Sequence, residues 1–499
     1  MSAAGTSRAD VCLILEGTYP YVTGGVSSWT HDLLGAQRDL TFHLITLLPK
    51  NAALTVRYQL PPNVVGTTQI FIQELPPGGR AKRHEEVFFK RLLPALLRLQ
   101  ARGRLADLRE LMAVIGPERR SLGSARLMNS PHAWAMLLEM YRGAVPTSSF
   151  LDFFWSWRSL VGGMFSVLLA DLPDAAVYHA VSTGYAGLLL ARAMLETGRP
   201  ALLTEHGIYT NERRIEMATA KWLHEAPTEG LQIDRPERTL KDLWVDTFVG
   251  YSHASYEASS EIITLYEGNQ QFQLQDGAPP EKLRIIPNGV DYDAYAAIPH
   301  VPLERRRRVA LIGRVVPIKD VKTFIRACAL LRATIPDLEA RVLGPTDEDP
   351  EYYEECLALV RHLGLESTVM FPGLVKLSEH YGRIDVLVLT SISEAQPLVV
   401  LEAGAAGVPS VTTDVGSCRE LIFGRGNEQP ALGPGGDVTP LCNPTATAQA
   451  MSRLLTDDAW HARCSHAIRQ RVHDHYHKRI VEQAYWNLYL QYMTAEAVA

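Results

Sequence analysis

The chain has 499 residues, which suits two large domains or several smaller ones and excludes a single small module. Hydrophobic residues make up 46% and charged residues 21%, so disordered, collagen-like and coiled-coil classes are excluded. The formal net charge of -6 gives no general attraction to nucleic acid or to anionic lipid, and we expect no nucleic-acid partner.

The cysteines and the apolar runs predict the compartment. The N-terminus lacks the apolar stretch of a secretory signal, and no convincing apolar run reaches the roughly 18 residues of a membrane-spanning helix. The cysteines are far apart without a CxxC pair, which favours buried free thiols over a disulfide or zinc framework. We therefore expect a cytoplasmic protein that reaches the inner membrane, if at all, through partner proteins. The cysteines are Cys12, Cys328, Cys356, Cys418, Cys442 and Cys464.

The first half of the chain begins with an α/β pattern. A strand at residues 11–15, a loop with Gly24 and Gly25, a helix at about 26–34 and a strand at 42–47 predict a Rossmann-like domain. From about 61 to 173 the sequence becomes mainly helical, and we interpret this segment as an insertion. Further strands are predicted at 176–179, 201–204, 247–250 and 283–286.

The second half alternates short β-branched runs with helix-length segments, which predicts a second doubly wound domain on a parallel sheet. The Pro- and Arg-rich residues 292–308 are typical of an exposed linker. We expect a first domain at 1–298, a second at 299–470, and a C-terminal helix at 471–499 that packs back on the first. The predicted strands are 309–312, 340–343, 368–371, 385–389 and 410–412, and the predicted helices are 321–333, 351–363, 377–381 and 397–406.

Two cations follow the first strand of the second domain. Gly313 and Arg314 come directly after it, and Lys319 lies five residues later in the loop that opens the next helix. Open α/β sheets bind ligands at the carboxyl ends of their strands, and an Arg with a Lys in such a loop suits a diphosphate. The alternative is two ordinary surface cations.

Two glutamates follow the strand predicted at 385–389. Glu394 is expected in the loop, and Glu402 in the second turn of a helix that begins at Pro397. Such a helix presents free N–H groups, here those of Leu398 and Val399, to an anion. Glu402 then suits a ribose diol, and Glu394 suits hydroxyls of a sugar beyond the phosphates. The alternative is a capping Glu and a solvated Glu on an ordinary helix.

Two further candidates follow strands of the first domain. Gly24 and Gly25 would let the backbone approach a ligand, although a Gly-Gly pair is often only a turn. His206 follows the strand at 201–204, although a single His is more often a structural residue. The sequence carries no metalloprotease, serine hydrolase or P-loop motif and no carboxylate cluster with metal-ligand spacing, so we expect no metal and no cofactor.

Together these motifs resemble the retaining glycosyltransferases of family 4, which have the GT-B fold. The stretches 16–28 and 204–210 are similar, more narrowly, to the PelF-type glycosyltransferases of bacterial Pel exopolysaccharide assembly, and the resemblance covers nearly the whole chain. It implies an α/β protein of GT-B fold, with two Rossmann-like doubly wound domains facing across a cleft. The motifs are Gly313-Arg314 with Lys319, Glu394 and Glu402 at E-x7-E spacing, and Pro287-Asn288-Gly289-Val290-Asp291.

The resemblance implies roles for the candidates in the second domain. Arg314 and Lys319 would neutralise the nucleotide diphosphate. Glu402 would hold the ribose hydroxyls, and Glu394 would touch the donor sugar. One departure is Asp320, where family members often have glycine. Its carboxylate would either cap the following helix or place an extra anion near the phosphates.

The resemblance also implies roles in the first domain and a mechanism. Gly24 and Gly25 would close on the phosphates from across the cleft. His206 would lie near the donor hydroxymethyl group or the reacting carbon, without acting as a general base. Breaking the bond from sugar to phosphate builds negative charge on the leaving diphosphate, which the cations and the helix N–H groups would stabilise without a metal.

The implied function is transfer from a UDP-sugar, either UDP-glucose or a UDP-N-acetylhexosamine, to a growing Pel exopolysaccharide at the cytoplasmic face. The implied partners are the donor, a glycan acceptor and inner-membrane subunits of a Pel synthase complex, with the helical insertion as the candidate docking surface. Two alternatives remain. One is a UDP-sugar 2-epimerase of the same fold, against which the E-x7-E spacing argues. The other is a non-catalytic sugar-nucleotide-binding subunit of a synthase complex.

Overall fold

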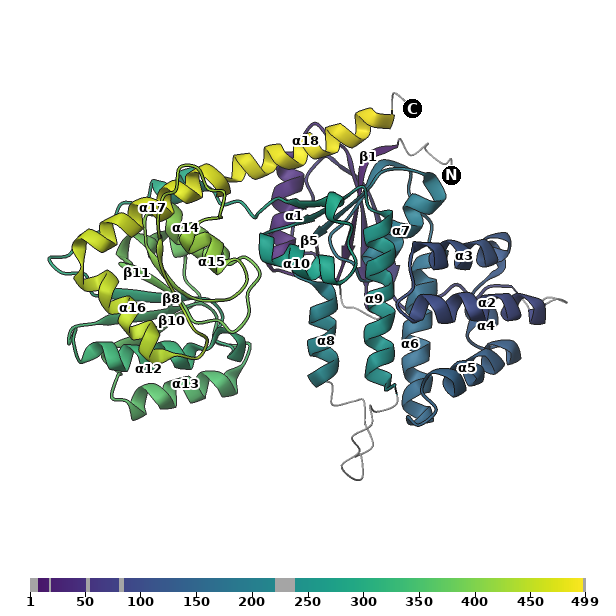
Figure 1. Ribbon diagram of the computed structural model, residues 1–499, viewed down its shortest axis with the longest axis horizontal. Helices are drawn as coiled ribbons and strands as arrows, with labels where there is room; N and C mark the ends of the chain where they lie inside the picture. Colours follow the sequence, from purple (N-terminus) through teal and green to yellow (C-terminus); the bar gives the residue numbers. More distant parts are fainter. Residues whose placement is uncertain (1–7, 18, 51–53, 80–84, 220–237, 497–499) are drawn as a thin grey trace. The chain divides into compact units, whose positions relative to one another are not determined.

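The computed structural model describes residues 8–496 apart from 18, 51–53, 80–84 and 220–237, and within these residues the chain forms two compact units (Figure 1). The first unit comprises Met1–Thr264, Asn269–Ile285 and Tyr485–Ala499, and the second comprises Leu265–Gly268 and Ile286–Ala484. The units divide at Ile285, earlier than residue 298, because the next residues pack with the second unit. Val290 N donates to Tyr476 O (2.9 Å), and Val301 N donates to Gly382 O (2.7 Å).

The first unit contains a seven-stranded parallel sheet in the order β3-β2-β1-β4-β5-β6-β7. The order reverses between β1 and β4, and this reversal is the switch point at which open α/β sheets bind ligands. The predicted Rossmann-like topology is therefore confirmed. The strands are β1 (Ala9–Glu16), β2 (Phe42–Leu48), β3 (Val64–Phe71), β4 (Ala175–Ala180), β5 (Ala201–Glu205), β6 (Glu261–Thr264) and β7 (Leu283–Ile285).

Helices cover both faces of this sheet and include the expected insertion. The insertion begins only after β3, an edge strand with alternating exposed residues that was not among the predicted strands of the mainly helical segment at about 61–173. The insertion helices are α2 (Glu85–Gln100), α3 (Leu105–Ile115), α4 (Ser124–Leu127), α5 (Pro131–Ala144) and α6 (Phe150–Leu169), with a 3-10 turn η1 (Gly116–Ser121). The other helices are α1 (Gly25–Ala36), α7 (Tyr185–Thr197), α8 (Tyr209–Thr219), α9 (Leu240–Ala258) and α10 (Glu267–Gln275), with a 3-10 turn η2 (Pro280–Lys282).

The strand predicted at 247–250 is wrong, because these residues lie inside α9. A capping box starts that helix: the Thr239 side chain accepts from Asp242 N (3.2 Å), and Asp242 Oδ2 accepts from Thr239 N (2.9 Å). The β-branched and aromatic residues that resemble a strand are buried because α9 packs against α7 and against helices of the insertion. Helix packing therefore overrides the local propensity for strand.

The second unit contains a six-stranded parallel sheet in the order β10-β9-β8-β11-β12-β13, which confirms the second doubly wound domain. Its switch point lies between β8 and β11. The first five strands match the predicted ones, and β13 was not predicted. The strands are β8 (Arg308–Ile312), β9 (Glu339–Leu343), β10 (Val369–Gly373), β11 (Val386–Leu389), β12 (Ser410–Thr413) and β13 (Gly436–Thr439).

The helices of the second unit agree with three of the four predicted ones. The helix predicted at 377–381 is wrong, because this segment forms two 3-10 turns, η4 (Leu377–Glu379) and η5 (Tyr381–Arg383). The helices are α11 (Tyr292–Ala296), α12 (Val321–Arg332), α13 (Pro350–His362), α14 (Leu398–Ala405), α15 (Cys418–Phe423), α16 (Pro444–Thr456) and α17 (Asp458–Tyr476), with a further 3-10 turn η3 (Pro317–Lys319).

The last helix, α18 (Lys478–Glu496), contributes its residues from Tyr485 onward to the first unit. There Tyr489 OH bonds His179 Nδ1 (2.8 Å), and Tyr485 OH bonds Thr204 Oγ1 (3.3 Å). All six cysteines are free, and five of them are buried, as the sequence predicts. No helix in the described part of the chain is both long and apolar enough to cross a membrane.

Candidate functional site

The two loops singled out in the second domain lie side by side at the switch point of its sheet. Ile392 N, in the loop after β11, donates to Ile318 O in the loop after β8 (2.8 Å). Thr390 Oγ1 donates to the carbonyls of Lys319 and Asp320 (3.0 Å each). The sequence motifs, which are about 75 residues apart, therefore meet at one edge of the sheet, as expected for loops that follow the two neighbouring strands β8 and β11 on either side of a switch point.

Lys319 and Glu394, the central pair of this edge, are bonded to each other. The Lys319 ammonium donates a hydrogen bond to Glu394 Oε1, and the two side chains are only 19% and 14% exposed. An ammonium has three N–H donors, so Lys319 can hold Glu394 and still offer N–H groups to an anion. The pair fixes the position of a cation next to a carboxylate that accepts hydrogen bonds.

Arg314 lies on the same loop as Lys319 but faces solvent. Its guanidinium donates to Glu348 Oε2 (2.7 Å), and the side chains of this ion pair are about half exposed. Exposed ion pairs contribute little stability, about 0–1 kcal/mol, so Arg314 can exchange Glu348 for a more highly charged anion at small cost. Its predicted contact with a diphosphate remains a prediction.

The N-terminus of α14 offers free backbone donors beside these loops. The helix begins at Leu398, so Pro397 is its N-cap and not its first residue as predicted, and no side chain caps it. The first N–H groups of a helix have no intrahelical acceptor, which leaves those of Leu398 and Val399 available. Together with the positive end of the helix dipole they form an anion-binding position.

Glu402 lies in the second turn of α14, where two tyrosines orient its carboxylate. Tyr381 OH donates to Glu402 Oε2 (2.5 Å), and Tyr295 OH also bonds this carboxylate. Burial raises the pKa of Glu402, while the hydrogen bonds from Tyr381 and Tyr295 act in the opposite direction. A carboxylate fixed in this way suits two adjacent hydroxyls of a ligand.

The structure accounts for Asp320 at a position where the resembling family often has glycine. Its φ is +43° and its ψ is +51°, in the left-handed region that glycine adopts most easily. Aspartate also tolerates this conformation, and Asp320 Oδ1 accepts from Thr323 N (3.2 Å), which caps α12. The cap that the sequence suggested is therefore confirmed.

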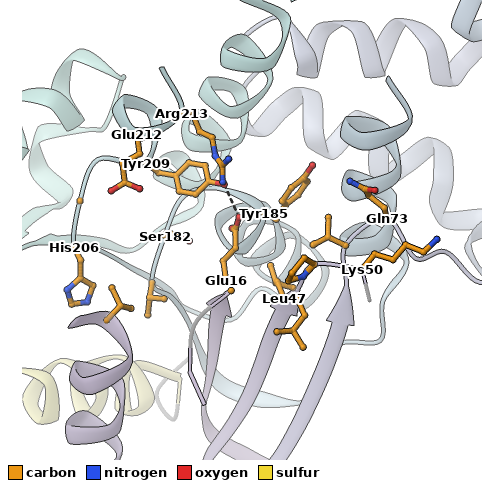
Figure 2. A pocket seen from close by; sticks show the side chains of 17 residues that line it. Glu16, Leu47, Lys50, Gln73, Ser182, Tyr185, His206, Tyr209, Glu212 and Arg213 are labelled. Carbon is orange, nitrogen blue, oxygen red and sulfur yellow. Dashed lines mark hydrogen bonds between the residues drawn. The ribbon is translucent and has the colours of Figure 1, made fainter. Parts of the chain in front are cut away.

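The first unit has a cavity of about 540 Å³ along the carboxyl edge of its sheet (Figure 2). Its walls come from the ends of β1 and β2, the loops after β3, β4 and β5, and the beginning of α8. The cavity thus occupies the switch point between β1 and β4, where the fold places ligands. Among the lining residues are Glu16, Lys50, Gln73, Ser182, Tyr185, His206, Tyr209, Glu212 and Arg213.

A hydrogen-bonded chain from Arg213 to Glu16 forms one wall of this cavity (Figure 2). Arg213 Nη2 donates to Tyr209 OH, which donates to Glu16 Oε1 (2.8 Å each), and Ala186 N donates to Glu16 Oε2 (3.1 Å). Burial raises the pKa of Glu16, against the effect of these donors and of the Arg213 charge. A Cβ on Gly184 would stand 2.4 Å from the Tyr209 ring, so this wall requires glycine there.

His206 lines the same cavity from the loop after β5. Its ring meets Trp29 edge-on, with ring centroids 4.6 Å apart, and its Nε2 has no hydrogen-bond partner in the described part of the chain. Burial lowers the pKa of His206 to about 4, so the imidazole is neutral at pH 7. A neutral imidazole can accept a hydrogen bond from a ligand hydroxyl or donate one to it.

Gly24 and Gly25 lie at the start of α1 and are not among the residues that line this cavity. The φ of Gly24 is 162°, an extended conformation open to any residue. A Cβ built on either glycine would meet no described atom within 4 Å. The described part of the fold therefore gives no reason for glycine here, and the expected contact with a ligand remains a prediction.

Next to His206, the carboxyl group of Glu205 is enclosed by donors. Tyr256 OH and Gln273 Nε2 donate to its Oε2 (2.8 Å each), and Thr183 Oγ1 donates to its Oε1 (3.2 Å). Burial nevertheless raises the pKa of Glu205 from its ordinary 4.5 to about 7. Glu205 thus titrates near neutral pH and lies beside the cavity without lining it.

Replacing Glu205 with glutamine should remove a pH dependence of stability. The pKa of Glu205 is higher in the folded state than in the unfolded state, so the unfolded state loses its proton first as the pH rises. Glu205 therefore lowers the free energy of unfolding of the wild type by about 3 kcal/mol between pH 4.5 and pH 7. The stability of Glu205→Gln relative to wild type should therefore rise over that interval. Chemical denaturation across this range measures the difference, with the exposed Glu139→Gln as the control. Parallel pH profiles for wild type and Glu205→Gln would refute the expectation.

The sequence prediction missed the residues that complete both sites. Tyr295 and Tyr381 reach Glu402 only through the fold, and no spacing in the sequence connects them. Arg213 lies one helical turn after Tyr209, and that i, i+4 relation was the available signal. Glu16 directly follows the strand predicted at 11–15, the same positional signal that identified His206 after the strand predicted at 201–204.

Two family matches cover most of the chain. Residues 9–281 match a family described as Domain of unknown function (DUF3492), and residues 306–457 match one described as Glycosyl transferases group 1. The chain is 31% identical over 215 residues to the D-inositol 3-phosphate glycosyltransferase of Kineococcus radiotolerans, a match covering 40% of this chain and 47% of that protein. The chain thus spans about half the length of this relative.

Two further similarities extend over more of the chain. The MMP alpha-(1->4)-mannosyltransferase of Mycolicibacterium hassiacum is 26% identical over 346 residues, which cover 67% of this chain and 72% of that protein. The crystal structure of HepE from Anabaena in complex with UDP has a TM-score of 0.58 and 14% identity, covering 96% of this chain and 99% of HepE. At this identity the likeness to HepE shows a common fold.

Proposed function

The chain belongs to the DUF3492 family, its residues 306–457 match the glycosyl transferases of group 1, and its fold is GT-B; from this premise we propose that the protein is a glycosyltransferase that uses a UDP-sugar. One observation carries the proposal. The bonded pair Lys319 and Glu394 lies at the switch point of the second sheet, in the loops bordering α12 and the uncapped α14. This combination suits a ligand with an anionic part and a hydroxyl-rich part.

The donor is proposed to bind in the second unit, with each group acting on one part of it. Lys319, Arg314 and the first N–H groups of α14 bind the diphosphate, where negative charge grows as the sugar bond breaks. Glu402, oriented by Tyr381, binds the ribose hydroxyls, and Glu394 binds the sugar. Since the charge on the leaving group is balanced by these groups, we propose a reaction that needs no metal ion. HepE, which has the same fold, binds UDP, and this supports the choice of nucleotide.

The acceptor is proposed to bind in the cavity of the first unit. Its wall of Glu16, Tyr209 and Arg213, together with the neutral His206, offers several hydrogen-bonding groups to sugar hydroxyls. None of these groups is assigned as a base. In the retaining transfer that the resemblance implies, the leaving phosphate takes the proton of the acceptor hydroxyl.

The finer assignment rests on the resemblance to PelF-type glycosyltransferases. It names UDP-glucose or a UDP-N-acetylhexosamine as donor and a growing Pel exopolysaccharide at the cytoplasmic face as acceptor. It also names inner-membrane subunits of a Pel synthase complex as partners. The similarity to known glycosyltransferases supports the reaction class, and the motifs around Glu16 and His206 support the finer assignment.

Calorimetric titration of the metal-free protein with UDP, GDP and ADP, and then with UDP-glucose and UDP-N-acetylglucosamine, tests the proposal. We expect UDP to bind in the presence of a chelator and to bind more tightly than the purine nucleotides. Binding of a UDP-sugar followed by transfer to an added glycan, detected by release of UDP, completes the test. Equal affinity for the three nucleotides, or no binding of any of them, would overturn the proposed donor.

A further inference from the structure

A second cavity of about 500 Å³ adjoins the cavity of the first unit, and Lys50 and Gln73 line both. Figure 2 shows Lys50 and Gln73 at the end of the first cavity opposite His206. The remaining walls come mainly from the first half of α6 and from Trp244 of α9, so the second cavity lies between the sheet edge and the insertion. The residues that line only this cavity are Met128, Trp155, Ser156, Arg158, Ser159, Gly162 and Trp244.

Two indole rings give this cavity apolar surfaces of the size of a sugar ring. The Trp155 residue is 61% exposed, although it lies in a well-formed helix, and its ring forms a T-shaped pair with the neighbouring Phe154 ring, with ring centroids 5.0 Å apart. Trp244 stacks on Phe248 with ring centroids 6.2 Å apart. An exposed tryptophan in a cavity is costly to hydrate and offers a flat face to the apolar side of a ligand.

Polar groups surround these rings at fixed positions. Gln73 Nε2 donates to Ser159 Oγ (2.6 Å), and Arg158 donates to Met128 O (3.3 Å). Ser156 Oγ is fully buried and has no hydrogen-bond partner among the residues that the structure describes. Such an atom favours a ligand that brings a hydrogen bond to it.

The backbone of Gln73 has a conformation that residues with a side chain rarely adopt. Its φ is +73°, in the left-handed region, where residues other than glycine carry strain. The residue follows β3, and its side chain lies where the two cavities meet. The strained backbone thus places an amide group, which can donate and accept, at the boundary between the cavities.

The charges of the second cavity select among ligands. Among the residues that the structure describes, its lining contains the cations Lys50 and Arg158 and no carboxylate. A cationic amino sugar is therefore disfavoured, and neutral sugars or sugars with acidic groups fit. Aromatic walls beside a few converging polar groups are typical of a ligand pocket. Glucose and N-acetylhexosamine, the sugars of the proposed donors, are neutral and therefore fit.

We propose that the two cavities form one continuous groove for a glycan chain, with the reacting end in the first cavity and the preceding sugar units on Trp155 in the second. This inference rests on the proposed function for the first cavity and deepens it: the acceptor is recognised along several neutral sugar units in the second cavity, and not as a single sugar or a lipid-linked monosaccharide. The helical insertion then determines which acceptors bind.

The test is direct binding of fluorescently labelled neutral glucose and N-acetylhexosamine oligomers, from monosaccharides to hexasaccharides, to the full-length protein. We expect the affinity to rise with chain length, and Trp155→Ala to bind the longer oligomers about tenfold more weakly, as expected for loss of a central aromatic contact. Trp134→Ala is the matched control, because Trp134 is 48% exposed on neighbouring α5 and lines neither cavity. Its binding should equal that of wild type.

The readout separates failure of this inference from failure of the proposed function. Affinity that does not depend on chain length, or wild-type binding of long oligomers by Trp155→Ala, overturns the groove. Calorimetric titration of Trp155→Ala with UDP should match wild type, because the second cavity contains no group assigned to the donor. If no nucleotide binds either protein while length-dependent glycan binding persists, the groove stands and the transferase proposal fails.

Discussion

Replacing Lys319 with alanine is expected to lower the turnover of sugar transfer about 10²- to 10³-fold, the usual cost of removing one preorganised group that stabilises transition-state charge. Lys319 is held by Glu394 at the carboxyl edge of the second sheet, so its ammonium is in position before the donor binds. UDP affinity should fall as well, because the same cation binds the ground-state diphosphate. Release of UDP measures the rate, and calorimetry measures the affinity.

Two further variants show whether the loss of turnover in Lys319→Ala comes from the lost contact with the phosphates or from the broken ion pair with Glu394. Glu394→Gln removes a negative charge beside Lys319, so UDP affinity should persist or rise while turnover falls. Lys322→Ala removes a cation of α12 that pairs with Glu355, and it should leave both quantities unchanged. Normal turnover in Lys319→Ala would exclude the proposed role of Lys319. Unchanged turnover in Glu394→Gln would exclude a contact of Glu394 with the reacting donor sugar.

The doubly wound architecture could be predicted because parallel strands are buried on both faces and read as continuous apolar runs. Residues 11–15 and 309–312 are of this kind, and both are central strands. Strand β3 was missed because it is an edge strand with polar, exposed positions. The error at 247–250 has the opposite cause: these residues are buried inside a packed helix, so their apolar and β-branched character gave no helical period.

The candidate residues of the second unit could be located because the carboxyl end of a parallel strand is a position that sequence reveals. Glu394 and Lys319 each follow a predicted strand, and the strand order then brings them together. What could not be predicted is their mutual bond, or the hydrogen bond from Tyr381 to Glu402. Both depend on side-chain directions in loops and 3-10 turns, which no periodic pattern encodes.

Replacing Arg471 with methionine should destabilise the second unit by about 3–5 kcal/mol, the cost of leaving a buried carboxylate without its partner. Arg471 is 1% exposed, and its Nε and Nη2 donate to the two oxygens of Glu428 (2.6 and 2.9 Å). Its guanidinium also donates to the carbonyls of Ile422 (2.9 Å) and Gly433 (2.7 Å). One side chain thus ties the loop between α15 and β13 to α17.

The destabilisation caused by Arg471→Met should also affect Glu402, whose carboxylate is proposed to bind ribose. Helix α17 packs so closely on α14 that a Cβ on Gly404 would come within 2.7 Å of Ile468. Loosening α17 therefore removes support from the helix that carries Glu402. We expect Arg471→Met to bind UDP more weakly only under conditions in which the second unit begins to unfold.

The pH dependence identifies the cause of the destabilisation. In the wild type, burial alone would raise the pKa of Glu428, but the hydrogen bonds and charge of Arg471 hold it below its ordinary value. This stabilisation is present above the unfolded pKa of about 4.3 and is lost as the pH falls through the lower folded pKa. In Arg471→Met the buried Glu428 should have a raised pKa, so the variant loses stability as the pH rises, and the difference from wild type is largest at neutral pH.

Denaturation with urea at pH 4 and pH 7, followed by circular dichroism and tryptophan fluorescence, measures this difference. Arg463→Met is the matched control, because Arg463 is exposed on the same helix, and surface substitutions of this kind usually stay within about 0.5 kcal/mol. If the difference in free energy of unfolding between Arg471→Met and wild type is equally large at both pH values, lost packing of the long side chain is the cause. If this difference becomes smaller toward pH 4, the unpaired charge of Glu428 is the main cause of the destabilisation.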